Sequence, residues 1–444
     1  MANKQTEVIE NIEQETKVEV NSSRQLFNEA FDEIFKYIKL PSNIQKAIKG
    51  TTLIRGGTSI FVGLPGTAKT TIIEMMAKVF GGKMAKITAA PQKVTLEGSF
   101  YRLDIPALMR GEEKIVWKEI TDADFLFISE INRAPQSFQD ELIDLLQYRE
   151  LESYGQIKKM KDNALGFLDM NWYRGTIDKA IGDRPRTLIS FPKADAMNRM
   201  QLSQQRFNKR SLTDLRKLVT KKADLDDLYA CQTEVEAIEL DPTALLIATL
   251  ITESFSACIY NRDFASERWI PPCFEDQLNK LGEVDTNIKP KCSFLGEICS
   301  CVKAPMAYRL DESLILLAKS FAWLEGSTKV SQDNITDALK YVVGNRLELR
   351  DSIAKHWVNA SVWVEKELTS YLNAKKLKQW GKAIDCYITI LKKDRTATEI
   401  ERAKDQLEAF AKKNVELRPF AYAVGIAEFE DEDLQKKKLD DDND

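Results

Sequence analysis

Residues 63–70 read Gly63-Leu64-Pro65-Gly66-Thr67-Ala68-Lys69-Thr70, and this stretch decides the fold. It follows a short apolar segment over residues 58–62 and precedes a helical pattern over residues 71–80. A glycine-rich loop between a strand and a helix is typical of phosphate-binding sites, because backbone N–H groups and the helix N-terminus both face the anion. The sequence therefore predicts a site for the phosphates of ATP.

Individual loop residues have expected tasks in nucleotide binding. Lys69 is predicted to reach the β- and γ-phosphates, and the Thr70 hydroxyl to ligate Mg²⁺. Ala68 stands where the general pattern has glycine, and its methyl group is tolerated there if φ is negative. The cradle for the cofactor is predicted to comprise Gly63, Leu64, Pro65, Gly66, Thr67, Ala68, Lys69, Thr70 and Thr71.

Apolar segments alternate with helical patterns around this loop. Further strands are predicted at residues 84–88, 125–128 and 187–191, with helices between them. Such alternation implies right-handed crossovers and a parallel sheet with helices on both faces. After about residue 220 the strand patterns fade. The predicted fold class is α/β, a P-loop parallel sheet with flanking helices, followed by an all-α lid domain and C-terminal helices.

These patterns divide the 444 residues into five segments. We expect a disordered N-terminus over 1–22, an α/β nucleotide-binding domain over 23–220 and a helical domain over 221–350. A C-terminal helical extension over 351–426 either docks a partner or packs on the lid, and an acidic tail occupies 427–444. No run of about 18 apolar residues and no signal-peptide stretch is present, which predicts a cytoplasmic protein without a membrane span.

The net charge of −4 is unlike that of a dedicated nucleic-acid binder. Residues 428–444 hold nine acidic residues and three lysines, a net charge of −6, so the remainder carries about +2. A basic channel is therefore not excluded. The tail itself is either a solvated disordered segment or a docking segment for a basic partner.

The segment Phe125-Leu-Phe-Ile-Ser129-Glu130 is an apolar strand that ends where two acidic residues are expected. The first acid holds Mg²⁺, and the second polarises the attacking water. Glu130 supplies the second, but Ser129 takes the place of the first and brings no charge. Its loss is expected to weaken Mg²⁺ binding by about 1–3 kcal/mol. Hydrolysis is then slow unless another acid compensates.

The loop, followed by Ser-Glu-Ile-Asn-Arg-Ala-Pro at residues 129–135, resembles the MoxR group of AAA+ ATPases. A third stretch, which includes Trp323 and Asn345-Arg346-Leu347, is similar to the helical lid of that group. The likeness covers roughly residues 24–350. It implies ATP and Mg²⁺ as cofactors.

The resemblance also implies tasks for two arginines. Arg206 matches the arginine finger that one subunit presents to its neighbour, and Arg309 matches the sensor-2 arginine that contacts the γ-phosphate from the lid. An ordinary surface role is the alternative for each, and Arg199 and Arg210 are competitors of Arg206 for the finger. The sensor-1 asparagine is not evident, because Phe191 occupies its expected place, with Asn198 or Asp195 as substitutes.

Residues 155–185 exceed the hairpin expected between the second motif and the last strand. They carry a basic and aromatic set, which comprises Lys158, Lys159, Lys161, Trp172, Tyr173 and Arg174. In ring ATPases this region faces the central pore, so it either contacts substrate or elaborates the surface.

Four cysteines cluster at positions 273, 292, 299 and 301. They lack the paired C-x-x-C spacing of zinc sites, which favours free thiols over a bound metal.

The leading hypothesis is an ATPase that assembles into a homo-oligomeric ring, expected to be a hexamer. The resemblance implies that it remodels a client protein or acts with a partner that has a von Willebrand factor A domain. Two alternatives remain open: a nucleic-acid-stimulated motor, and a nucleotide-dependent scaffold with slow hydrolysis.

Overall fold

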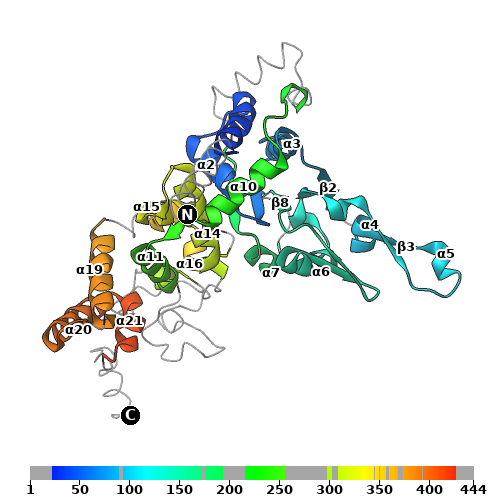
Figure 1. The fold of residues 1–444 in the computed structure, drawn as a ribbon. Helices are drawn as coiled ribbons and strands as arrows, with labels where there is room; N and C mark the ends of the chain where they lie inside the picture. Colours follow the sequence, from blue (N-terminus) through cyan, green and yellow to red (C-terminus); the bar gives the residue numbers. More distant parts are fainter. Residues whose placement is uncertain are drawn as a thin grey trace, which may run out of the picture. The chain divides into compact units, whose positions relative to one another are not determined.

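A computed structural model describes residues 23–89, 94–171, 177–193, 216–255, 298–302, 309–344, 346–349, 351–356, 360–368, 374–392 and 394–426 (Figure 1). The chain forms two compact units. The first comprises Met1–Glu239 and Leu316–Lys329, and the second comprises Leu240–Ile315 and Val330–Asp444.

The first unit is built on a five-stranded sheet with the order β2-β5-β8-β1-β9. Its strands are β1 (Thr58–Val62), β2 (Met84–Thr88), β5 (Phe125–Ser129), β8 (Leu165–Met170) and β9 (Thr187–Ser190). Every neighbouring pair runs parallel. The predicted parallel sheet is confirmed. Its carboxyl-terminal edge brings together the ends of β1, β5 and β8.

Helices cover both faces of this sheet. Those of the first unit are the helix over residues 23–37, α2 (Ser42–Thr52), α3 (Lys69–Val79), α4 (Leu96–Phe100), α5 (Ile105–Leu108), α6 (Gln136–Tyr148), α7 (Lys179–Asp183), α10 (Leu225–Glu236) and the later part of α14 (Arg309–Leu324). On one face, Leu142 of α6 and Ile181 of α7 share a core with Leu168. Elsewhere, α3 contacts β5 and β8, and Phe27 of the first helix packs against Phe80. The sheet is therefore buried, as its apolar strands require.

Two small antiparallel hairpins extend the first unit. They are β3 (Tyr101–Leu103) with β4 (Ile115–Trp117), and β6 (Glu150–Ser153) with β7 (Gln156–Lys159). The 3₁₀ helices η1 (Glu119–Asp122) and η2 (Ile131–Arg133) precede and follow β5.

Strand β8 corrects the prediction for residues 155–185. Part of that stretch is a central strand of the sheet, between β5 and β1, and all six of its residues are buried. The sequence pattern missed it because Gly166 and Asp169 interrupt its apolar run. Gly166 is needed there, since a Cβ atom would lie 2.5 Å from Thr58 Oγ1 on β1. Strand β9, predicted at residues 187–191, is therefore the fifth strand of the sheet in chain order.

The described part of the second unit is helical, as predicted. Its elements are α11 (Pro242–Glu253), α13 (Ile298–Cys301), the start of α14, α15 (Gln332–Val343), α16 (Asp351–Ala354), α17 (Ala360–Trp363), η3 (Val364–Leu368), α19 (Ala374–Leu391), α20 (Ala397–Ala411), η4 (Val415–Leu417) and α21 (Arg418–Ala423). The two-residue strands β10 (Glu239–Leu240) and β11 (Lys329–Val330) pair with each other. Helix α11 contacts α15, α19 and η4. The C-terminal helices therefore pack on a helix of the lid, which favours the packing role over a separate docking module.

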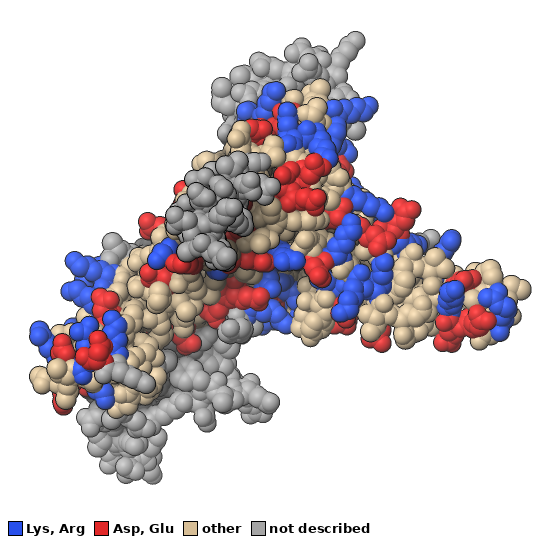
Figure 2. Space-filling view, viewed as in Figure 1, with Lys and Arg blue, Asp and Glu red and all other residues tan. Residues whose placement is uncertain are grey.

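Charges of both signs are interspersed over the surface. On the face in Figure 2, Lys and Arg side chains lie among Asp and Glu side chains across the described residues. On this face, such mixing gives the described residues no broad field of one sign with which to attract a polyanion. Within the described residues, no helix combines the length and the apolar character needed to cross a membrane.

Candidate functional site

The phosphate-binding loop leaves the end of β1 and enters α3, which begins at Lys69. Lys69 is buried, and its Nζ atom donates to the carbonyl oxygens of Gly63 at 2.8 Å and Leu64 at 3.2 Å. Gly66 has a left-handed φ of 82°, which glycine adopts without steric cost. A side chain on Gly63 would meet Phe191 at 3.0 Å. Phe191 therefore packs against the loop.

Ala68 differs from its expected conformation. Its φ is +66°, so the condition of a negative φ under which we expected the methyl group to be tolerated is not met. An alanine in the left-handed region costs roughly 1–2 kcal/mol relative to the right-handed one. The residue is the N-cap of α3 and fixes the turn from the loop into the helix. The loop thus holds strain where a nucleotide would bind, and strain of this kind clusters at ligand sites.

The end of β5 presents Ser129 and Glu130 beside the loop. Glu130 also has a left-handed φ, of 57°, which turns the chain sharply out of the strand. Its carboxylate pairs with the Arg133 guanidinium at 2.5 Å, and its backbone N–H donates to Asp169 Oδ1 at 2.6 Å. The predicted water-polarising group is therefore positioned from two sides.

Strand β8 brings in two residues that the sequence analysis missed. Asp169 lies near the end of β8, and Asn171 directly follows it, where its backbone carbonyl accepts a hydrogen bond from Asn132 Nδ2 at 2.8 Å. Both line the same pocket as the loop. The signal that could have found them is Asp-x-Asn after an apolar run about 40 residues beyond the second motif. Asn198 and Asp195, the substitutes considered for sensor 1, lie outside the described residues.

One pocket of about 270 Å³ collects these groups from three parallel strand ends. It is lined by Pro65, Gly66, Thr67, Ala68, Lys69, Thr70, Thr71, Ser129, Glu130, Asp169, Met170 and Asn171. Ligands of doubly wound sheets bind at this edge, outside the carboxyl ends of the strands. The structure thus places the predicted loop, Ser129 and Glu130 together, while their catalytic roles stay predictions.

The chemistry of this pocket suits a magnesium nucleotide. Burial lowers the pKa of the Lys69 ammonium group, while the nearby carboxylates of Asp169 and Glu130 act in the opposite direction. Hydroxyls of Thr70 and Ser129 and the carboxylate of Asp169 are oxygen donors, which Mg²⁺ prefers together with phosphate oxygens. The cation and the donor set therefore fit ATP with Mg²⁺.

The described pocket does not test two of the predicted residues. Arg206 is outside the described residues. Arg309 is the first residue of α14, in the second unit, and its contact with a γ-phosphate stays a prediction. Cys301 forms no disulfide, and within the described residues no group of acidic, histidine or cysteine side chains forms a metal cluster. Cys273 and Cys292 lie outside the described residues.

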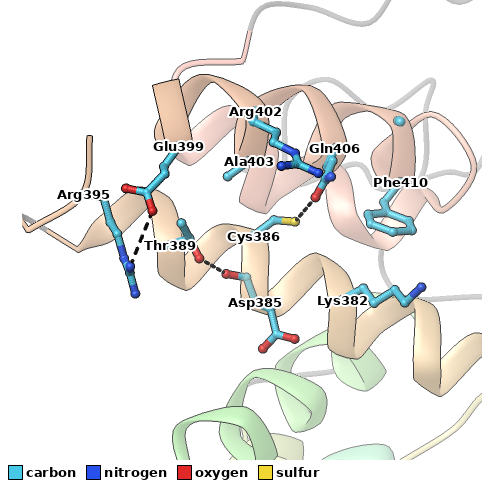
Figure 3. Close-up of a pocket in the computed structure, with 11 residues that line it drawn as sticks. Lys382, Asp385, Cys386, Thr389, Arg395, Glu399, Arg402, Ala403, Gln406 and Phe410 are labelled. Atoms are coloured by element: carbon cyan, nitrogen blue, oxygen red, sulfur yellow. Dashed lines mark hydrogen bonds and ion pairs between the residues drawn. The ribbon is translucent and has the colours of Figure 1, made fainter. Parts of the chain in front are cut away.

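A larger groove, of about 670 Å³, lies between α19 and α20 in the second unit (Figure 3). Its polar side chains largely engage one another: Cys386 contacts Gln406 at 3.4 Å, and Glu399 pairs with Arg395 at 3.8 Å. It contains neither a glycine loop nor the end of a parallel strand. The smaller loop pocket is therefore the better candidate for nucleotide chemistry.

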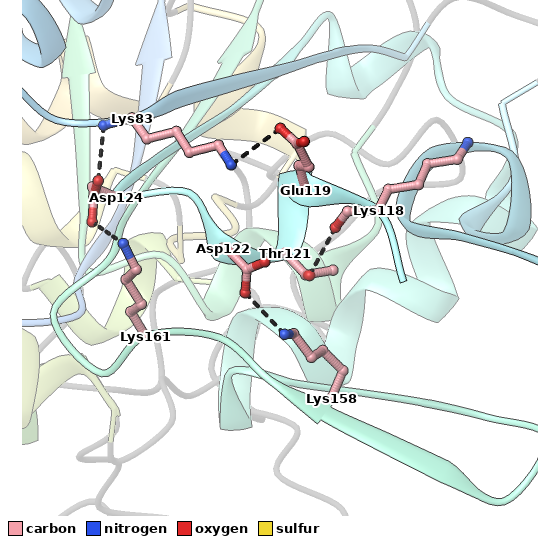
Figure 4. A network of polar contacts seen from close by, with 8 residues as sticks. All are labelled: Lys83, Lys118, Glu119, Thr121, Asp122, Asp124, Lys158 and Lys161. Carbon is pink, nitrogen blue, oxygen red and sulfur yellow. Dashed lines mark hydrogen bonds and ion pairs between the residues drawn. The ribbon is translucent and has the colours of Figure 1, made fainter. Parts of the chain in front are cut away.

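The lysines near the β6–β7 hairpin are ion-paired. Lys158 binds Asp122 at 2.9 Å, and Lys161 binds the buried Asp124 at 2.6 Å (Figure 4). Lys159 binds Glu150 at 2.7 Å. This network joins the hairpin to the segment that enters β5. The three lysines that motivated a substrate-binding insert are thus neutralised within the fold, whereas Trp172, Tyr173 and Arg174 lie outside the described residues.

Comparison with known proteins agrees with this geometry. Residues 58–171 match the family described as "AAA domain (dynein-related subfamily)". Over 120 residues the chain is 31% identical to "Chaperone MoxR1" of Mycobacterium tuberculosis, a match that spans 27% of this chain and 31% of that relative. The fold is similar to the crystal structure of a candidate ATPase from Cytophaga hutchinsonii, with a TM-score of 0.62, 15% identity and coverage of 81% of this chain and 98% of the other.

Proposed function

We propose that this chain, a MoxR-type AAA+ protein, binds ATP with Mg²⁺ and couples its hydrolysis to the remodelling of a protein partner. The observation that carries the proposal is the single pocket in which Lys69, Thr70, Glu130 and Asn171 meet at the end of a parallel sheet. The matched relative is named a chaperone, and the chain spans 31% of that relative's length.

Each group in the pocket has a task in this account. Backbone N–H groups of the loop and the N-terminus of α3 hold the phosphates, and Lys69 neutralises the β- and γ-phosphates. Thr70 contributes a hydroxyl oxygen for Mg²⁺. Glu130 orients the attacking water once its carboxylate leaves Arg133, and Asn171 contacts the γ-phosphate as the sensor.

The proposal includes a homo-oligomeric ring, a hexamer by analogy with the group. Among the described residues, those that line the loop pocket include no arginine, so a neighbouring subunit is the natural source of one. Arg206 is one candidate. Arg184 is a second: it follows α7 and precedes β9, and the beginning of a parallel strand lies at the opposite edge of the sheet from its own nucleotide. From there Arg184 acts only on a neighbour.

A protein client fits the described surface better than nucleic acid. Apolar side chains are exposed around the two hairpins: Ile105 is 59% and Met109 85% exposed between β3 and β4, and Ile157 is 58% exposed on β7. Exposed apolar residues of this kind serve protein contacts. A partner with a von Willebrand factor A domain and a cytoplasmic location complete the proposal, on the strength of the resemblance.

Steady-state ATP hydrolysis by the wild type and by Glu130→Gln tests this function. The wild type is expected to turn over ATP with Mg²⁺, and the variant to bind ATP with hydrolysis reduced at least about a hundredfold. If both proteins bind ATP but neither hydrolyses it, the nucleotide-dependent scaffold is the correct account. The observation that supports this second candidate function is the serine at position 129, where an acidic residue is expected.

Two further experiments distinguish a protein partner from a nucleic-acid partner. Stimulation of the wild-type rate by single- or double-stranded nucleic acid would support the motor and count against the protein client. Affinity capture with Glu130→Gln, which holds ATP without hydrolysing it, is expected to enrich one protein only when ATP is present. A Lys69→Ala sample is the control, because the substitution is expected to weaken nucleotide binding and to leave the protein surface unchanged.

A further inference from the structure

The site departs from a complete magnesium site at one position, Ser129. A serine at the end of β5 brings a hydroxyl oxygen but no negative charge to a divalent cation. Mg²⁺ in nucleotide sites is ordinarily held by one or two carboxylates together with the phosphates. Either the metal binds weakly here, or a carboxylate arrives from another element.

Asp169 is such a carboxylate. In the sheet register, Leu168 stands opposite Ile128, so the next residues along the two parallel strands, Asp169 and Ser129, reach the same edge. Asp169 is only 7% exposed, and it lines the loop pocket together with Thr70 and Ser129. A buried carboxylate needs a positive partner. Within the described pocket the fixed positive charge is that of Lys69, whose ammonium group feels the field of Asp169.

The contacts of Asp169 leave it able to serve a cation. One oxygen, Oδ1, accepts the N–H of Glu130 at 2.6 Å, which fixes the carboxylate in the pocket. A neutral oxygen could accept the same hydrogen bond, so the negative charge of Asp169 is not required to hold Glu130 in place. Burying an ionised group costs free energy, which the field of Lys69 offsets in part. A bound metal ion would give the charge a further stabilising partner.

We propose that Asp169 supplies the carboxylate for Mg²⁺ that Ser129 does not, so that the metal site is made by Thr70, Ser129 and Asp169. In this arrangement the carboxylate comes from the end of β8 and not from the end of the neighbouring strand β5. This inference rests on the proposed function, since it assumes that ATP binds on the loop. It predicts that the Ser129 substitution does not make the protein a weak metal binder.

The variant Asp169→Asn separates this role from a purely positional one. Asparagine keeps an oxygen that accepts the Glu130 N–H but removes the charge. The readout is the affinity for a fluorescent ATP analogue, measured with excess Mg²⁺ and with EDTA. The wild type is expected to bind the analogue more tightly with Mg²⁺, and Asp169→Asn is expected to lose about tenfold or more of that gain. Affinity in EDTA is expected to stay equal or rise, because a negative charge beside the phosphates is gone.

A second substitution returns the charge to β5. Ser129→Asp in the Asp169→Asn background is expected to recover most of the Mg²⁺-dependent gain. Exchange of the exposed Asp140 for Asn on α6 is the control and is expected to change neither affinity. If Asp169→Asn keeps the full gain, the proposal is wrong, and Asp169 only positions Glu130. If the wild type binds the analogue in neither condition, the proposed function itself fails.

One measurement on the wild type does not depend on any variant folding. Protein with ¹³C-labelled aspartate carboxyl groups is loaded with ADP and Mn²⁺ in place of Mg²⁺, and electron–nuclear double resonance is recorded. A ¹³C coupling to the manganese is expected. Manganese bound with ADP but without any ¹³C coupling would overturn the assignment of Asp169 to the metal.

Discussion

Ala68 shows at the scale of one residue how the loop differs from its sequence pattern. The residue has a left-handed φ of 66°, the region that glycine tolerates and alanine does not. The sequence identified the loop because Lys69, Thr70 and the flanking elements have fixed spacing. It did not reveal the conformation of Ala68, since backbone angles depend on the way β1 and α3 are joined in space.

Ala68→Gly is expected to increase the free energy of unfolding by up to about 1 kcal/mol. Removal of the left-handed strain provides about 1–2 kcal/mol, which the greater freedom of glycine in the unfolded chain partly offsets. Urea denaturation without nucleotide measures the change. Ala77→Gly inside α3 is the matched control and is expected to lower stability by about 1 kcal/mol. Equal losses in both variants would show that Ala68 is not strained.

Strand β8 marks the limit of the sequence at the scale of an element. Strands β1, β2 and β5 were predicted within a residue of their ends, because their apolar runs are short and bounded by turns. Strand β8 was missed, because burial on both faces is possible for Gly166 and Asp169 only when neighbouring strands supply space and a hydrogen-bond donor. Asp169 and Asn171 were missed with it, so the sequence located the loop and the end of β5 but not the third strand end of the pocket.

Gly166→Ala is expected to destabilise the first unit by about 1–3 kcal/mol, since overpacking a buried site costs that much. The added Cβ atom would lie 2.5 Å from Thr58 Oγ1 on the adjacent strand. Thr58→Ala removes that oxygen, so the double variant is expected to lose less stability than the two single losses together. Thermal unfolding of the three variants measures this coupling, and simple additivity would refute the steric explanation.

At the scale of the whole molecule, we propose that the subunits assemble into a ring. An arginine that acts across an interface leaves each subunit inactive alone, whether it is Arg184 or Arg206. Its removal is expected to lower the hydrolysis rate about 10³-fold or more, because it stabilises charge on the γ-phosphate in the transition state.

Mixing experiments test this arrangement. Arg184→Ala keeps its nucleotide pocket, and Lys69→Ala keeps its arginine, so mixed rings contain some complete sites. Activity is expected to reappear when the two inactive proteins are combined and exchanged. If Arg184→Ala is fully active alone and Arg206→Ala takes its place in the mixture, Arg206 is the finger. No recovery with either arginine variant would contradict an acting arginine from a neighbour.

Equilibrium binding of MgATP to Glu130→Gln, with and without Lys69→Ala, is the direct test of an ATP site on residues 63–70. The first protein holds ATP intact, so a dissociation constant is measurable by calorimetry. Loss of the charge-assisted contacts of Lys69 is expected to weaken binding roughly ten- to a hundredfold. Equal affinity in the two proteins, or no binding in either, would contradict an ATP site on residues 63–70.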